Sequence, residues 1–155
     1  MTIAAQLGVV RAALAAWALN HRGTAAIAGD PVHLFSLLRS GVPGAVRALV
    51  IFQDELKRGE IEEAGFVDRT YVVIVSRGRG FTIEPSDSLV KTVGSGEALY
   101  DLVEGVRDVL RDLQFGDDTE DRPDVKKITL FSMAEQLTDA YQIEFTIGCQ
   151  LAVPA

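Results

Sequence analysis

The most regular pattern in the chain lies near its C-terminus, where apolar and polar residues alternate. The apolar positions are Tyr141, Ile143, Phe145, Ile147, Cys149 and Leu151. A period of two over this length predicts an antiparallel strand with one dry face and one wet face. The run 128–134 predicts a strand just before it, and residues 135–139 are then the hairpin connection.

Two further apolar runs predict strands. Residues 45–53 (AVRALVIFQ) are rich in branched side chains, and residues 68–77 (DRTYVVIVSR) are typical of a central strand. The segment 54–63 between them offers no apolar face, so it predicts an exposed loop, which could project from the domain. Its charged residues are Asp54, Glu55, Lys57, Arg58, Glu60, Glu62 and Glu63.

Two segments have the periodicity of amphipathic helices. Ile3, Leu7, Val10, Leu14 and Trp17 recur at spacings of four and three, and Ala fills most other positions. A second helix is predicted from an N-cap at Ser95 to a stop at Gly116, with one broad apolar face. Its opposite face carries Asp101, Glu104, Arg107, Asp108, Arg111 and Asp112. Residues 23–31 read as a loop, and residues 33–38 as a short helix.

The order helix, strand, strand, helix, strand, strand predicts an α+β fold. We expect a four-stranded, mostly antiparallel sheet packed with two main helices. A chain of 155 residues has the length of one domain, so residues 1–155 are expected to form a single unit.

The charge balance narrows the choice of partners. The chain has 15 basic and 22 acidic residues, which gives a formal net charge of -7. This balance argues against a protein that grips DNA phosphates, although not against one that lets DNA pass. No apolar run reaches the roughly 20 residues of a membrane span, and Arg11 interrupts the apolar N-terminus, so we expect a soluble intracellular product.

Candidate chemistry is sparse. The sequence has no phosphate-binding loop, nucleophile elbow, HExxH helix or paired CxxC. His21 is expected to be solvated or to cap the first helix, and His33 has no partners for a metal. Cys149 is expected to be a buried, inert thiol, and residues 94–96 (GSG) a plain helix cap. We therefore expect no enzyme, no catalytic residue, no metal and no cofactor.

An acidic segment precedes the closing strands. Its residues are Asp117, Asp118, Glu120, Asp121 and Asp124. They lack the spacing of an EF-hand, and Pro123 interrupts them, so a solvated loop is favoured over a calcium site. The same charges could supply negative potential.

The arrangement of these elements resembles the tail terminator proteins of long-tailed bacteriophages, or the related neck and tail-completion proteins. The resemblance is carried by the N-terminal helix, the strands AVRALVIFQ and RTYVVIVSR, the helix GEALYDLVEGVRDVLRDLQFG, and the closing pair KKITLFSMA and DAYQIEFTIGCQL. It covers nearly the whole chain, with residues 24–44 fitting less well. The likeness is in the order of the elements and in their patterns of apolar and polar residues, because these families have no signature motif or catalytic residues.

The resemblance implies a structural virion protein, assembled in the host cytoplasm, that caps the tail tube as a hexameric ring. Its implied partners are further copies of itself, the tail tube protein, and a head–neck connector or stopper protein. DNA would pass through the lumen without specific binding, and no membrane is involved. The second helix's charged face would then meet neighbouring subunits, the acidic segment would lie at the lumen or rim, and the 54–63 loop would be a projecting arm. The alternative is a dimeric, ferredoxin-like module that binds a small molecule, with residues 94–96 as its ligand loop.

Overall fold

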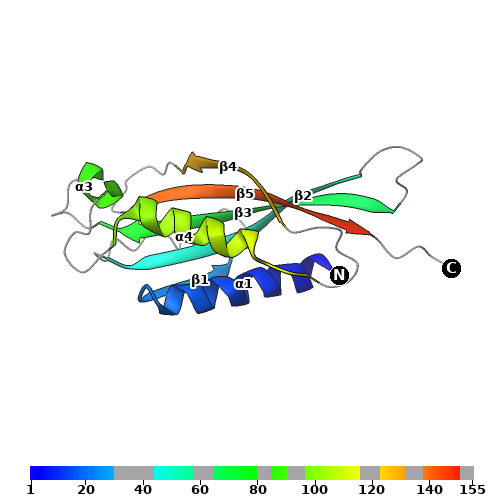
Figure 1. Cartoon of the computed structure of the whole chain (residues 1–155), viewed down its shortest axis with the longest axis horizontal. Helices are drawn as coiled ribbons and strands as arrows, with labels where there is room; N and C mark the ends of the chain where they lie inside the picture. Colours follow the sequence, from blue (N-terminus) through cyan, green and yellow to red (C-terminus); the bar gives the residue numbers. More distant parts are fainter. Residues whose placement is uncertain are drawn as a thin grey trace.

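A twisted sheet forms the centre of the molecule (Figure 1). The computed structural model describes residues 1–29, 44–57, 65–79, 85–90, 97–115, 123–131 and 138–150. The strands are β1 (Gly23–Ile27), β2 (Val46–Lys57), β3 (Phe66–Gly78), β4 (Asp124–Leu130) and β5 (Thr138–Gln150). They lie in the order β1-β2-β3-β5-β4.

The sheet is five-stranded and mixed, so the prediction of four mostly antiparallel strands is wrong. β1 runs parallel to β2, from Gly23 opposite Val46 to Ile27 opposite Val50, and the other pairs are antiparallel. The sequence GTAAI lies in the segment predicted as a loop, and its Gly and Ala residues have low strand propensity. Pairing with β2 and packing against α1 (Ile3–Leu19) stabilise a strand here nonetheless.

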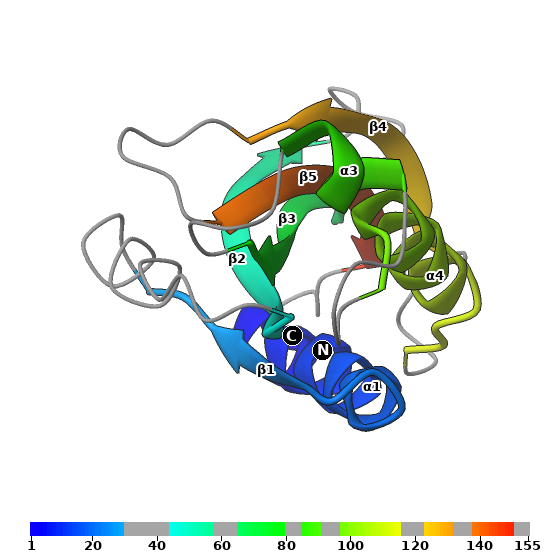
Figure 2. The same ribbon diagram turned by 90° about the vertical axis from the view of Figure 1, so that its left-hand side faces the viewer.

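Two long helices, α1 and α4 (Leu99–Arg111), lie side by side on one face of the sheet (Figure 2). α1 packs on β1 and β2, whereas α4 packs on β3, β4 and β5. The main core lies between these layers and includes Leu14 and Trp17 of α1, Tyr71 of β3, Leu102 of α4 and Phe145 of β5. A short helix, α3 (Pro85–Val90), was not predicted and packs against α4 and β5.

The start of α1 follows local capping, whereas the start of α4 does not. The Thr2 side chain accepts a hydrogen bond from the Ala5 backbone N–H and so caps the start of α1. α4 starts later than predicted, because its N-cap is Ala98, which has no side-chain capping bond. It ends at Arg111, and the predicted cap Ser95 and stop Gly116 lie outside the described residues.

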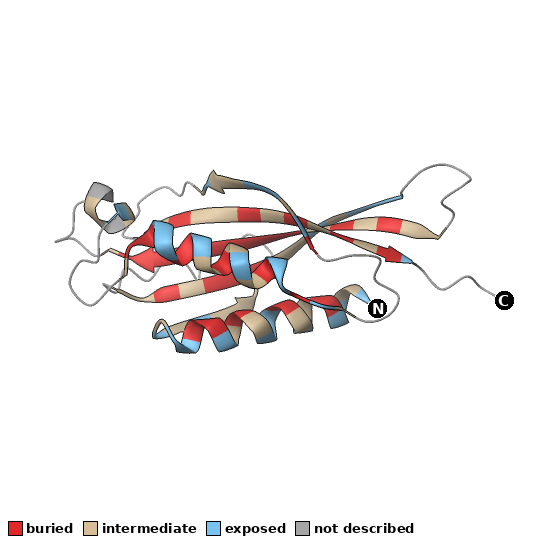
Figure 3. Ribbon diagram, viewed as in Figure 1, coloured by how far each residue is buried: buried red, intermediate tan, exposed pale blue. Residues whose placement is uncertain are grey.

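The long alternating strand is confirmed. Along β5, Ile143, Phe145, Ile147 and Cys149 are buried and the residues between them are partly exposed (Figure 3). β5 already begins at Thr138, so Asp139 belongs to a strand and not to a hairpin connection. β4 spans Asp124–Leu130, four residues earlier at each end than predicted. Leu151 lies outside the described part of the chain.

The predicted loop 54–63 is wrong in its first part. β2 continues through Lys57 and stays paired with β3 as far as Lys57 opposite Val67, after an irregularity between Phe52 and Asp54. Asp54, Glu55 and Lys57 are therefore strand residues. The other charged residues assigned to the loop, Arg58, Glu60, Glu62 and Glu63, lie outside the described residues. In the part of the chain that the structure describes, no helix is long and apolar enough to cross a membrane.

Candidate functional site

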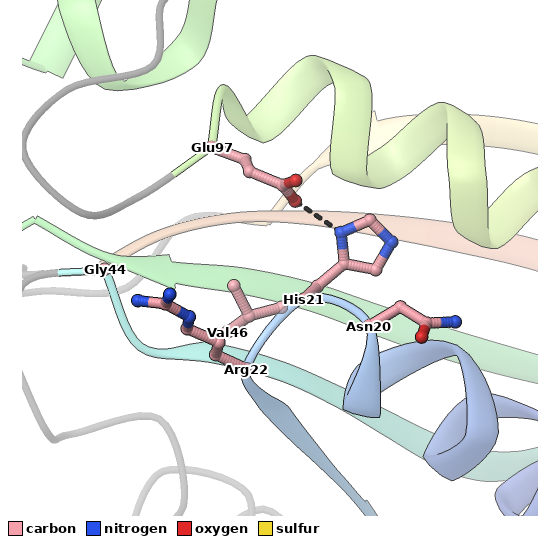
Figure 4. A pocket seen from close by; sticks show the side chains of 6 residues that line it. All are labelled: Asn20, His21, Arg22, Gly44, Val46 and Glu97. Carbon is pink, nitrogen blue, oxygen red and sulfur yellow. Dashed lines mark hydrogen bonds and ion pairs between the residues drawn. The ribbon is translucent and has the colours of Figure 1, made fainter.

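A small polar pocket lies at the turn that joins α1 to β1 (Figure 4). It has a volume of about 260 Å³ and is lined by Asn20, His21, Arg22, Gly44, Val46 and Glu97. The turn is tight: Arg22 has a positive φ of 54°, and a Cβ on Gly23 would lie 2.7 Å from the carbonyl oxygen of Val46. Backbone geometry therefore positions the residues of this pocket.

His21 is the chemically distinctive group in the pocket. Its Nδ1 contacts the Glu97 carboxylate, which approaches from the segment before α4 (Figure 4). Its ring also lies against Trp17, with 4.6 Å between centroids. The expectation that His21 is merely solvated or capping is therefore wrong, because this side chain connects the end of α1 to the start of α4.

Among the described residues that line the pocket, the His21–Glu97 pair has no serine, threonine or cysteine beside it. A histidine–carboxylate pair can transfer a proton, but it needs a nucleophile or a bound electrophile beside it. Among the described residues, no three His, Cys, Asp or Glu side chains gather as a metal site would require. His33 and residues 94–96 lie outside those residues.

A buried polar cluster forms at the opposite end of α1. The side chain of Gln6 is fully buried and accepts hydrogen bonds from Tyr71 Oη (2.6 Å) and from Arg69 Nη1 (3.1 Å). Its Nε2 donates to Cys149 Sγ at 2.8 Å. Arg69 also donates to the Met1 carbonyl (2.6 Å) and through Nε to Glu55 (2.8 Å). These contacts attach the start of α1 to β2, β3 and β5.

Within the cluster, burial keeps the Tyr71 hydroxyl in its neutral form. Burial raises the pKa of the Tyr71 hydroxyl well above its ordinary value, and the nearby Arg69 guanidinium opposes this only in part. Cys149 is buried, as predicted, and its thiol faces Gln6. The sequence contained a signal for this cluster: Gln6 is three residues after Ile3 and four before Val10, so it shares their helix face.

The charged face of α4 is where the sequence placed it. Asp101, Glu104, Asp108, Arg111 and Asp112 are exposed, and Arg107 is partly exposed with its Nε 3.3 Å from Asp108. The apolar face is confirmed by the burial of Leu99, Leu102, Val103, Val106 and Leu110. The outer face of α4 is therefore available for contacts with another molecule.

The acidic segment is only partly described. Asp124 is an exposed residue of β4, not of a loop, and it accepts a hydrogen bond from Lys126 Nζ at 2.5 Å. Asp117, Asp118, Glu120 and Asp121 lie outside the described residues.

Comparison with known proteins gives no family assignment. No model of a known protein family matches the chain, and a search of curated proteins finds no relative. Function must therefore be argued from the chain's own surfaces.

Proposed function

We propose that this protein is a structural ring subunit that caps the tail tube of a long-tailed bacteriophage and joins it to the neck. A terminator must bind the last tube ring on one side and present a different surface on the other. The subunit therefore needs two unlike ends and a side that meets its neighbours. This reasoning supports a tail terminator, together with the likeness of the N-terminal helix, the two apolar strands, the second helix and the closing strand pair. The structure adds β1 and α3 to the element order predicted from the sequence.

The observation that carries the proposal is the extension of β2, β3 and β5 beyond the helices. Strands of 12 and 13 residues are longer than the usual five or six, and the ends of β2 and β3 reach past α1 and α4 (Figure 1). Leu56 and Lys57 are exposed there. We call the paired ends of β2 and β3 the strand ribbon. A paired ribbon is stiffer than a loop, so it suits a projecting contact with a partner such as the tube protein.

The rival function is a dimeric module that binds a small molecule. The pocket at the α1–β1 turn, at about 260 Å³, is smaller than the roughly 300–1,000 Å³ typical of ligand sites. Its lining is mostly polar, whereas such sites are lined mainly by apolar side chains. This pocket, formed by described residues, therefore gives the module little support.

A tube-assembly assay tests the proposal. Purified chain is added to polymerising tail tube protein, and tube lengths and ends are measured by electron microscopy. We expect tubes to stop growing and to carry an extra ring at one end. Tubes that grow to the same length with and without the chain would refute the proposed function.

A further inference from the structure

An exposed aromatic and apolar cluster lies beside the start of α4. Tyr100 and Leu130 are 40% and 65% exposed. Tyr141 pairs directly with Leu130 across the β4–β5 ladder, and its hydroxyl lies 3.3 Å from that of Tyr100, with the two rings edge to face. We call Tyr100, Leu130 and Tyr141 the tyrosine patch. Exposed tyrosines flanked by apolar side chains are typical of binding hot spots.

A second apolar surface lies on α1. Gly8, Ala12, Ala16 and Leu19 are exposed on the side of the helix away from its buried residues, and Leu19 is 79% exposed. We call these four residues the α1 outer face. Small side chains allow close approach, so this face can receive bulky side chains such as tyrosine.

The two surfaces lie on opposite sides of the molecule. α1 covers the β1 side of the sheet, and the tyrosine patch includes Leu130 of β4, the other edge strand. α1 and β4 are on opposite sides in both views, while the end of α1, the end of β4 and the start of α4 lie in the same half of the long axis (Figures 1 and 2). Two unlike patches on opposite sides join copies head to tail, and such contacts generate a ring when the rotation between copies closes.

The charges on the two helices beside these surfaces are complementary, while β4 also carries the exposed Lys126 and Lys127. Residues 1–29 contain no Asp or Glu, and Arg11 and Arg22 are exposed there. Beside the tyrosine patch, Asp101 and Glu104 are exposed, and the outer face of α4 carries four acidic residues against two arginines. Attraction between these surfaces favours the head-to-tail contact over a symmetric contact of either surface with itself.

We infer that the tyrosine patch of one copy packs on the α1 outer face of the next copy, with Arg11 facing Asp101 and Glu104. The inference rests on the proposed ring function, for which it identifies the contact between neighbouring subunits. The partner is therefore a second copy of this chain.

A mixing experiment with two variants tests the pairing. Ala16→Glu places a charge on the α1 outer face, Leu130→Glu places one in the tyrosine patch, and Gln150→Glu is the control at an exposed site on neither surface. Sedimentation should show concentration-dependent assembly beyond the dimer for the wild type and the control, and monomers for each variant alone. An equal mixture of the two variants retains one intact contact, so it should give dimers and nothing larger.

A charge exchange provides a second measurement. Arg11→Glu or Glu104→Arg alone should weaken assembly about two- to fivefold, and the two combined in one chain should restore it.

Three outcomes would each overturn the inference: wild type that remains monomeric at the highest concentration, variants that assemble normally, or a variant mixture that stays monomeric. If Ala16→Glu assembles and still caps tubes, the contact is wrong and the ring function stands. If wild type assembles as expected but does not cap tubes, the contact stands and the function fails.

Discussion

Gln6 shows how one polar residue can fix the position of a helix on a sheet. Its amide satisfies groups from two strands, Tyr71 of β3 and Cys149 of β5, and it also accepts a bond from Arg69. A buried donor without a partner is costly, so α1 cannot slide or rotate without losing these bonds. The helix periodicity alone predicted that this face is buried, but not which polar partners would meet it.

Replacing Gln6 by methionine should lower the free energy of unfolding by about 2–3 kcal/mol. The side chain keeps its volume, while Tyr71 and Arg69 each lose a buried acceptor. Urea denaturation measures the loss. The control Gln53→Met, at an exposed position of β2, should change stability by less than about 0.5 kcal/mol. Equal effects of the two changes would mean that the buried bonds contribute nothing.

Tyr71 should make the protein sensitive to alkali. Burial raises the pKa of its hydroxyl, so the group keeps its proton in the folded chain at pH values where the unfolded chain, with a pKa near 10, releases it. The stabilisation is complete below about pH 10 and is lost as the pH rises toward the folded value, by up to about 1.4 kcal/mol per pH unit. Unfolding measured across this range should have a shallower slope in Tyr71→Phe, and identical slopes would contradict the assignment.

Among the elements, those with strong periodicity were predictable and β1 was not. β5 and α4 show their buried faces in the sequence, because each carries apolar residues at the period of its structure. β1 has five residues, mostly small or weakly strand-forming. Its stability comes from pairing with β2, which is distant in sequence, and from packing against α1, and neither contact is visible in the local sequence pattern. The His21–Glu97 contact was equally hidden, since it joins residues 76 positions apart.

The contact between α1 and α4 gives a matched pair of glycine substitutions. A Cβ on Gly105 would lie 3.0 Å from Trp17 Nε1, whereas one on Gly8 would meet nothing within 4 Å. Gly105→Val should therefore lower the free energy of unfolding by about 1–3 kcal/mol, because the helices must move apart. Gly8→Ala should raise it by about 0.5–1 kcal/mol through helix propensity. Denaturation midpoints that shift in the same direction would contradict this packing.

At the scale of the whole molecule, the proposed functions occupy separate surfaces. The tyrosine patch and the α1 outer face lie on the sides, whereas the strand ribbon extends along the long axis (Figure 1). Ring formation and contact with the tube should therefore be separable by mutation. The sequence predicted a projection in this region from its charges, but it did not predict that part of the projection is paired strand, because charged residues are poor strand formers in isolation.

A substitution of Leu56 tests whether the strand ribbon contacts the tail tube. It is 63% exposed near the end of β2. In a tube contact an exposed leucine would be buried, and Leu56→Asp would then place a charge in that contact, which should reduce capping at least tenfold, since burying an unpaired charge costs several kcal/mol. Sedimentation should show unchanged assembly, because the substitution touches neither lateral surface. Gln53→Asp, an equally charged change at an exposed residue of the same strand, should retain more capping than Leu56→Asp. Normal tube length with Leu56→Asp would exclude the ribbon from the tube contact, and loss of ring assembly would show that the ribbon belongs to the lateral interface instead.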